Sequence, residues 1–528
     1  MALDRACVIS LAVVGGVTRL VSLSSPRSPV FDEVHVGRFV NRYWAGEYFF
    51  DVHPPLAKLL YLGVSAWLGY DPSQCSYSEP SAHATGGNLL HVELEEQCAM
   101  WQLRATPAVL GALLPALMFV ICRRGFGLGR AAAAIAALVV TCDNLFLVLA
   151  RVHMNDGVYL FFVGLAVLCA TQLARADIAA ERGAGISWAA ATGIALGAAM
   201  QSKFLAAVPT VLWVGMQQFV TLVVIVRRGA SCTRIAAHAV RRVALLLGVP
   251  LVMHAAMYTV HLRLLPRSGT GDGYMTAAFQ SSLEGNSHCA AKSPRSESTR
   301  AALGRVAELT VRQVRYNEQM AAHFPPGSNA FDSPWWSWWG LAKGVVWNVN
   351  GGGNAVVAFS GNPIPWLLCS IVVVLATLAA LGWVLRAVLE PDAEVPARAE
   401  PRSWLWLWVL CGYWTQLLPY AVLSRQMFLH YYASAYLFAI VLLAFAVDAL
   451  AKLPRRASAC GRASTAAVRC AALAFCAATI GAFCYLWPIS VGSSLSKTGL
   501  KERITFAHTA CWHSVSQQTT FTTTHPLC

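Results

Sequence analysis

Charged residues are scarce in this sequence. Asp, Glu, Lys and Arg make up only 12% of its 528 residues, whereas 56% are apolar. A soluble globular chain carries roughly 25% charged residues. Half of that fraction leaves too little polar surface to cover a water-soluble body of this size. The composition therefore excludes a soluble globular protein and predicts an all-α polytopic membrane protein.

The signatures of several other classes are missing as well. The sequence has neither a P-loop pattern nor a Gly-x-Gly-x-x-Gly pattern, so nucleotide binding is not indicated. It has no internal repeat at a solenoid period and no paired broken helices of the kind that transporters carry. The net charge of +14 is not gathered on a soluble basic domain, which argues against nucleic-acid binding.

Cysteine is present but does not indicate a disulfide scaffold, because most of the 16 cysteines lie inside apolar stretches. Cys75 and Cys98 share one polar loop and could form a bridge if that loop faces an oxidising compartment. The apolar run 7–17 resembles a signal peptide, but Arg19 interrupts it and no clear cleavage site follows. We therefore expect a retained first span.

Apolar stretches long enough to cross a bilayer predict about 11 transmembrane helices. They lie near 7–23, 101–121, 131–150, 157–174, 188–201, 204–226, 240–262, 363–385, 404–422, 427–449 and 467–487. With this count, most Arg and Lys residues of the connecting loops fall on one side, which the positive-inside rule makes cytosolic. The opposite, lumenal side receives the loop 24–100, the long loop 263–362 and the tail 488–528.

These sides divide the chain into four regions. Residues 1–262 form an N-terminal transmembrane module, 263–362 a long lumenal loop, 363–487 the C-terminal transmembrane helices and 488–528 a lumenal tail. The tail is rich in Ser and Thr at 514–524 and is predicted to be disordered there. In the long loop, the tryptophans of 335–339 are either interfacial anchors or a sugar-stacking platform.

The chemistry-bearing residues begin with Asp32 and Glu33, just after the first apolar span. Acids beside a membrane span are costly to desolvate and are seldom kept without a reason. Asp32 is a candidate general base, with Glu33 orienting the acceptor or a partner arginine. The alternative for Asp32 is an N-cap, because a helix-like stretch, 35–44, follows it. The pattern alone leaves both interpretations open.

Cations stand at several membrane boundaries. Arg19 lies in the first span and Arg104 opens the second, so each should face a partner or a wet cavity, and either acid could be that partner. Lys203 and Arg425 are predicted at lumenal span ends, where they could neutralise a lipid-linked phosphate or snorkel to headgroups.

His53, beside two prolines, is either a turn element or a proton donor. Asp32, Glu33 and His35 could be read as a divalent-metal cluster, but no further ligand is identifiable. No metal site is predicted.

Nine motifs occur in order along the chain. They are FDEVH (31–35), YFFDVHPPL (48–56), RATPA (104–108), the polar positions Asp143, Asn144, Arg151 and Asp156, SK (202–203), GDGYM (271–275), FQSSLEGN (279–286), GNP (361–363) and RQMFLHYY (425–432). In this order they resemble the eukaryotic protein O-mannosyltransferases, which use dolichyl-phosphate mannose. The resemblance covers the chain from about Arg19 to Tyr432.

The resemblance implies a GT-C type glycosyltransferase in the endoplasmic reticulum membrane. Its implied reaction transfers mannose from dolichyl-phosphate mannose to Ser or Thr hydroxyls of secretory-pathway proteins, with inversion and without a metal or other cofactor. Asp32 corresponds to the family's catalytic acid and Glu33 to its neighbour. The donor-phosphate and substrate-binding candidates are Arg19, Arg104, Lys203, Arg425, His53 and Asn362.

One departure from the family concerns the long loop. Typical eukaryotic members carry a β-trefoil MIR module there, whereas about 45 residues separate Asn286 from the tryptophan cluster here, too few for such a domain. A MIR-less form is therefore expected, acting as a homodimer or with a related mannosyltransferase. Two alternatives remain open: a polyprenyl-phosphate-sugar transferase acting on a glycolipid or glycan, and a catalytically silent partner subunit.

Overall fold

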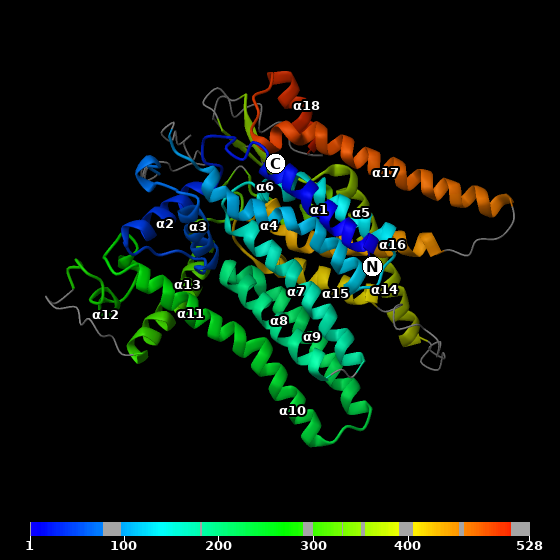
Figure 1. The fold of residues 1–528 in the computed structure, drawn as a ribbon, viewed down its shortest axis with the longest axis horizontal. Coiled ribbons are helices and arrows are strands. Elements are labelled where there is room, and N and C mark those ends of the chain that lie inside the picture. Colours follow the sequence, from blue (N-terminus) through cyan, green and yellow to red (C-terminus); the bar gives the residue numbers. More distant parts are fainter. Residues whose placement is uncertain are drawn as a thin grey trace.

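The computed structural model describes residues 2–77, 97–179, 182–288, 299–329, 331–349, 354–389, 405–452 and 459–507. Helices dominate it (Figure 1). The first eleven are α1 (Ala2–Leu20), α2 (Glu33–Ala45), α3 (Leu56–Trp67), α4 (Trp101–Val120), α5 (Arg130–Thr141), α6 (Asn144–Leu149), α7 (Asn155–Ile178), α8 (Arg182–Ser202), α9 (Phe204–Arg227), α10 (Cys232–Val243) and α11 (Val249–Leu264). The rest are α12 (Ala277–Gln280), α13 (Thr299–His323), α14 (Pro363–Leu389), α15 (Leu405–Leu417), α16 (Ala433–Lys452), α17 (Ala459–Val491) and α18 (Lys497–Ala507).

The described residues contain eight helical segments long and apolar enough to cross a membrane. They are Trp101–Gly125, Asn155–Ile178, Gly183–Ser202, Phe204–Arg227, Cys232–Leu264, Pro363–Leu389, Leu429–Lys452 and Ala466–Val491. Each coincides with one of the predicted spans, including the short range 188–201. The other three predicted spans correspond to α1, to α5 with α6, and to α15, so the full count of eleven stays a prediction.

The predicted span 131–150 is not one continuous helix. Asp143 ends it and begins the next, because its Oδ1 accepts hydrogen bonds from the backbone N–H groups of Leu145 (3.0 Å) and Phe146 (3.2 Å). An Asp that satisfies the free N–H groups of a helix start is a strong N-cap. The break thus follows from the polar residue, and it divides the range into α5 and α6.

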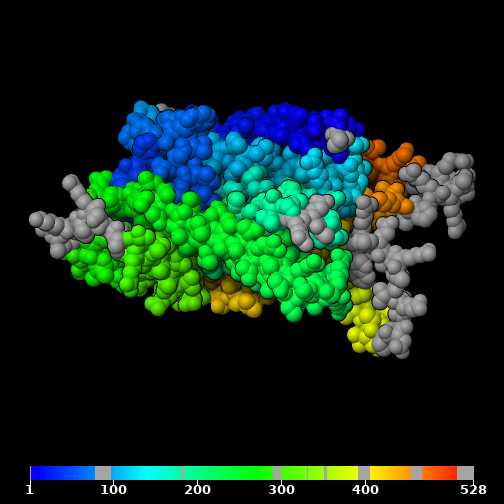
Figure 2. Space-filling model, turned by 60° about the horizontal axis from the view of Figure 1, so that its bottom comes forward, coloured from blue at the N-terminus to red at the C-terminus, as the bar shows by residue number. Residues whose placement is uncertain are grey.

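Most of the non-spanning structure lies at one end of the molecule. Figures 1 and 2 place α2 and α3 at that end beside the segment that follows α11, and the ends of α14 and α16 lie at the opposite end. A parallel bridge between Glu47 and Arg267 joins the loop after α2 to the segment after α11. The ends of α14 and α16 carry Arg386 and Lys452, which the charge pattern assigns to the cytosolic side, and this assignment of sides stays a prediction.

The long loop contains ordered structure. Residues Thr299–His323 of this loop form the helix α13, and strands β1 (Val345–Asn348) and β2 (Val356–Phe359) form an antiparallel pair. This pair packs against α17 and α18, with Leu486 and Ile504 in the shared apolar cluster. The tail is thus folded as far as Ala507, and its Ser/Thr-rich segment 514–524 lies outside the described residues.

The tryptophans of 335–339 lie on a short 3-10 helix and divide between core and surface. Trp338 is fully buried, and its indole N–H donates to Ser333 Oγ at 2.9 Å. Trp336, in contrast, is 67% exposed. The cluster is therefore partly a packing element, which neither of the two sequence-based interpretations included.

Candidate active site

Glu33 is the centre of a closed polar network at the start of α2. Arg104 of α4 donates from Nε to Oε1 at 2.9 Å and from Nη2 to Oε2 at 2.7 Å. The backbone N–H groups of Val30 and His153 donate to the same carboxylate at 2.8 and 2.9 Å. His153 Nδ1 lies 2.7 Å from Oε1. Both charged side chains of the Glu33–Arg104 pair are fully buried.

Burial opposes the ionisation of Glu33, but the positive charge of Arg104 and the contacts with Arg104 and His153 outweigh it and hold the pKa of Glu33 well below its ordinary value. The carboxylate is therefore a permanent anion at neutral pH. It is enclosed by protein, so it cannot accept a proton from a substrate that enters from outside. Its geometry suits a positioning residue.

Two arginines fold the loop that leads to the acid pair. Arg104 Nη1 donates to the carbonyl of Pro26 at 2.6 Å, and Arg151 donates to the carbonyls of Val21 (2.7 Å) and Ser22 (2.6 Å). Guanidinium groups carry five N–H donors in a fixed geometry, which lets one side chain hold several carbonyls. The direction of the chain into Asp32 is therefore set from α4 and from the α6–α7 junction.

His153 and Arg151 were not among the predicted site residues. The signal that could have found them is the polar run Arg151 to Asp156 between two apolar stretches, since polar groups at membrane depth need partners. The run appears as a motif, but nothing in it shows that the imidazole of His153 reaches back to Glu33. Its Nε2 also lies 3.0 Å from the Glu33 carbonyl oxygen.

Asp32 occupies the N-cap position of α2, as the alternative reading expects, yet it does not act as a cap there. Within the described part of the chain its carboxylate makes no capping hydrogen bond. Burial raises the pKa of Asp32, and the carboxylates of Asp156 and Asp51 add to the rise, while His35 and Lys203 oppose it. Asp32 is thus an under-bonded acid in a strongly charged setting.

Lys203 lies at the junction of α8 and α9, where it lines a small crevice. Its Nζ donates to Asp156 Oδ1 at 2.7 Å and lies 4.6 Å from the centre of the Tyr431 ring. The crevice is also lined by side chains from α6, α7, α9, the start of α16 and the 3-10 helices Leu418–Val422 and Leu429–Tyr432, among them Leu149, Leu160, Tyr420, His430 and Ser434. A cation beside an apolar wall suits an anionic lipid-linked group.

The corner that carries His53 is fixed by Lys58. The ammonium group of Lys58 donates to Asp51 Oδ2 at 2.5 Å and to the carbonyls of His53 and Pro54, both at 2.9 Å. Burial lowers the pKa of His53 to about 4, so its imidazole is neutral at neutral pH. The charges of Asp51, Lys203, Lys58 and Asp156 all act on it, which places His53 in the same electrostatic neighbourhood as Asp32.

The remaining candidates lie elsewhere. Arg19 is fully buried and donates to the carbonyls of Val140 (2.8 Å) and Thr141 (2.9 Å), so neither acid is its partner. Asn362 is fully buried, and its side chain donates to the carbonyls of Cys142 (2.9 Å) and Thr479 (2.8 Å). Arg425 is half-buried, with Nη1 3.5 Å from Asn317 Oδ1, at a distance that makes this a weak contact.

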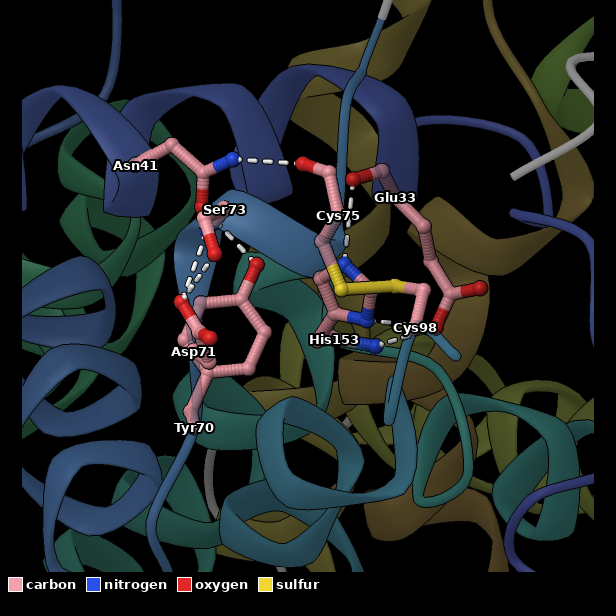
Figure 3. The surroundings of a disulfide bond; sticks show 8 residues. All are labelled: Glu33, Asn41, Tyr70, Asp71, Ser73, Cys75, Cys98 and His153. Carbon is pink, nitrogen blue, oxygen red and sulfur yellow. Dashed lines mark hydrogen bonds and ion pairs between the residues drawn. A yellow bond between two sulfur atoms is a disulfide. The ribbon is translucent and has the colours of Figure 1, made fainter. Parts of the chain in front are cut away.

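Cys75 and Cys98 form a disulfide with a Cα–Cα distance of 4.8 Å, so the bridge that the sequence left open is present. Figure 3 shows it beside α2, next to Glu33 and His153. Asn41 donates to the Cys75 carbonyl at 2.7 Å and accepts from the Tyr70 hydroxyl at 2.8 Å. The bridge joins the segment lying on α2 to the residues that precede α4 and its Arg104.

No group of three or more His, Cys, Asp or Glu side chains gathers to hold a metal ion among the residues that the structure describes. Asp32, Glu33 and His35 follow one another in the sequence but do not form such a group. Whether the reaction needs a metal is a separate chemical question.

Comparison with known proteins identifies two matching family models. One, described as dolichyl-phosphate-mannose-protein mannosyltransferase, matches residues 9–266, and the other, the C-terminal four TMM region of protein-O-mannosyltransferase, matches 303–509. Dolichyl-phosphate-mannose–protein mannosyltransferase 1 of Candida albicans is 31% identical over 306 residues, which are 58% of this chain and 32% of that protein. The enzyme of the same name from Saccharomyces cerevisiae is 33% identical over 288 residues, 54% of this chain and 33% of that protein.

These alignments span about a third of the length of the curated relatives. The fold is similar to that in the structure of the S. cerevisiae protein O-mannosyltransferase Pmt1-Pmt2 complex bound to the sugar donor. The TM-score is 0.77 at 19% identity, covering 99% of this chain and 95% of that chain. The predicted helical GT-C type membrane fold is thereby confirmed. Since the two family models together account for most of the sequence, the chain belongs to the dolichyl-phosphate-mannose–protein mannosyltransferase family.

Proposed function

We propose that this protein transfers mannose from dolichyl-phosphate mannose to Ser and Thr hydroxyls of secretory-pathway proteins. The observation that carries the proposal is the state of Asp32: an acid at a helix N-cap whose carboxylate makes no capping bond within the described residues and faces a field of charged groups. Family membership supplies the substrate class, and the S. cerevisiae Pmt1-Pmt2 structure is that of a relative bound to the sugar donor.

In the proposed mechanism Asp32 is the general base. It takes the proton of the acceptor hydroxyl while the hydroxyl oxygen attacks the anomeric carbon of the mannosyl group. The bond from that carbon to the phosphate oxygen breaks, and dolichyl phosphate leaves with the electron pair. Attack from the face opposite the phosphate inverts a β-linked donor to an α-mannoside. A raised pKa makes Asp32 a stronger base than an ordinary carboxylate, which favours the proton transfer.

Lys203 is the foremost candidate for the leaving phosphate. One of its three N–H donors is used by Asp156, which leaves two for phosphate oxygens. The adjoining crevice, with Leu149 and Leu160 in its lining, offers an apolar wall for the first part of the lipid. Arg425 is a second cation for the same phosphate, held loosely enough to move towards it.

The other candidates receive supporting roles. Glu33 with Arg104 positions Asp32, and His53 faces the same set of charges as a neutral hydrogen-bonding group. The contacts of Arg19 and Asn362 with backbone carbonyls support a scaffolding role for both rather than a direct contact with the donor. Because the leaving group already departs as a phosphate anion, the chemistry does not require a metal.

We also propose an endoplasmic reticulum location with the site on the lumenal side, where the Cys75–Cys98 bridge would be stable. A homodimer or a heterodimer with a related mannosyltransferase is the proposed assembly, by analogy with the Pmt1-Pmt2 complex. The interval between the two matched family regions is residues 267–302, which is too short for a β-trefoil and supports a MIR-less form.

The decisive experiment measures mannose transfer by the purified chain from dolichyl-phosphate mannose to a Ser/Thr-rich peptide, with and without EDTA. Release of the transferred sugar by an α-mannosidase, but not a β-mannosidase, would support inversion. Transfer that survives chelation would support metal independence.

Two control reactions separate the alternatives. Transfer that requires a full-length relative would favour the silent-partner reading. Transfer to a glycolipid but to no peptide would contradict protein mannosylation.

A further inference from the structure

Three aromatic rings from distant parts of the sequence meet beside the candidate active site. Phe50 stacks on Tyr274 with ring centres 4.7 Å apart, and Tyr316 of α13 contacts both, at 5.6 Å from each. The set lies at the edge of the apolar core: Phe50 is half-buried and packs against the cluster around Phe49, Tyr316 is half-buried, and Tyr274 is 50% exposed. We call Phe50, Tyr274 and Tyr316 the aromatic platform.

One turn of α13 carries Tyr316 of the platform and also contacts residues of the candidate active site. Gln313 Nε2 donates to the carbonyl of Asp51 at 2.7 Å, and Asp51 directly follows Phe50. On the same turn, Asn317 accepts from Arg425. Tyr316 lies between these two residues, so the turn reaches both the His53 corner and the proposed phosphate-binding arginine. A molecule lying on the platform would therefore be next to the groups around Asp32.

The platform is also held rigidly. Gly271 packs against the backbone beneath Phe50 so closely that a Cβ there would lie 2.0 Å from the Phe50 nitrogen. Asp272 Oδ2 accepts hydrogen bonds from Ser268 and, at 2.8 Å, from Asn286. A fixed, partly exposed aromatic surface loses little conformational entropy on binding, which is a common property of recognition sites.

We propose that the aromatic platform is the docking surface for the acceptor polypeptide, in particular for the proline-containing residues that flank the modified Ser or Thr. This inference rests on the proposed function and names the recognition element of the same site. Aromatic surfaces bind extended proline-rich segments because the rings pack against pyrrolidine rings and peptide planes. Polar neighbours such as Asp272 and the Thr276–Glu308 pair favour a peptide over a lipid chain at this position.

The test compares two acceptors with the purified enzyme. One is a threonine peptide flanked by prolines, and the other is N-acetyl-threonine amide, which has no flanking residues. Tyr274→Ala should raise KM for the peptide by about tenfold, with kcat and the donor KM unchanged, because it removes ring contacts made by flanking residues alone. Turnover of the blocked threonine should be unchanged, and Tyr274→Phe should behave as the wild type.

Trp336→Ala is the matched control, since Trp336 is also an exposed aromatic residue but is not part of the platform. Equal peptide KM values for Tyr274→Ala and the wild type would overturn the inference while leaving the proposed function intact. Transfer by the wild type to neither acceptor would instead count against the proposed function.

A binding experiment without turnover tests the platform independently. The photoreactive residue p-benzoylphenylalanine, placed at position 274, should cross-link the proline-flanked peptide in detergent and in vesicles without donor. Cross-linking to phospholipid in place of the peptide would overturn the inference and assign this surface to the membrane. Because Tyr274 is 50% exposed, we expect the larger side chain to extend towards solvent and the protein yield to be maintained.

Discussion

The two neighbouring acids, Asp32 and Glu33, sit in regions that are built in opposite ways. Around Glu33, each carboxylate oxygen accepts at least two hydrogen bonds or ion-pair contacts, from Arg104, His153 and a backbone N–H, and the group is sealed from solvent. Around Asp32, the carboxylate makes no capping bond within the described residues, and like charges from Asp51 and Asp156 act on it.

This difference distinguishes an acid with a structural role, Glu33, from an acid with a catalytic role, Asp32. A buried charge whose partners are all present stabilises one arrangement of the chain. Here that arrangement fixes the position of the backbone at Asp32. A partly accessible acid without fixed partners contributes little to stability but retains oxygen lone pairs for a substrate proton. Local structure usually leaves such a group only where it has a functional use.

Asp32→Asn is expected to have the largest effect on the reaction. Loss of the general base should lower kcat by about 10²–10⁴-fold, since an amide cannot accept the hydroxyl proton. The thermal midpoint should stay close to the wild-type value, because the side chain makes no capping bond among the described residues. Radiolabelled mannose transfer and a thermal unfolding scan measure the two quantities. Retention of full activity would remove Asp32 as the base.

Glu33→Gln should mainly lower the stability of the fold. It leaves the guanidinium of Arg104 buried without its counter-ion, which costs about 3–5 kcal/mol in comparable buried pairs. The expected result is a lower thermal midpoint together with lower transfer. The double variant Glu33→Gln with Arg104→Met is the control, because it removes both charges and should recover part of the stability. A normal midpoint with no activity would instead make Glu33 a direct participant.

The location of the two acids at the site could be predicted from sequence. Which arginine pairs with which acid could not. The order of motifs and the position of Asp32 after an apolar span indicated the site. Either acid remained a possible partner for Arg19 or Arg104, since sequence distance does not show which helix faces which. The structure pairs Arg104 with Glu33 and assigns Arg19 to carbonyls of α5.

Residues whose roles depend on tertiary contact were out of reach for the same reason. His153 meets Glu33 across 120 positions of sequence, and Lys203 meets Asp156 across 47. Helix boundaries failed where one polar residue outweighs an apolar run: Asp143 splits the predicted span 131–150 by capping α6. Composition defines the spans well, and individual polar side chains decide how they are interrupted.

Removing the disulfide tests what stabilises the region around Glu33. Replacing Cys75 and Cys98 together by Ser releases a bridge across 23 positions and should lower the free energy of unfolding by about 3 kcal/mol. Transfer per folded molecule should change little, because the bridge touches the Glu33 side of the site. Thermal scans with and without reductant measure the loss, and exposed, unbridged Cys232→Ser serves as the control. An unchanged midpoint would contradict a bracing role.

Lys203→Ala should weaken donor binding beside Asp32, and it should lower the stability of the fold less than Glu33→Gln does. We expect about a tenfold increase in KM for dolichyl-phosphate mannose, since one charge-assisted contact to phosphate is lost. Arg425→Ala should have a smaller effect, because its 3.5 Å contact with Asn317 shows a loosely held side chain. Donor titrations measure both, with the exposed Lys497→Ala as a charge-matched control. Unchanged donor affinity in both variants would contradict the phosphate assignment.

Lowering the pH is the mildest perturbation, and it should affect the two carboxylates at different pH values. The pKa of Asp32 is raised above 3.8, so the base becomes protonated, and kcat falls, at a higher pH than an ordinary Asp would allow. The pKa of Glu33 is lowered below 4.5, so its stabilising contribution, complete above that value, is lost only as the pH falls through the lower folded pKa. Protonating Asp32 removes a charge that partial desolvation and the carboxylates of Asp156 and Asp51 disfavour, and should itself stabilise the fold slightly. Activity should therefore disappear on acidification while the thermal midpoint persists, and a parallel fall of both would show that the two acids do not act separately.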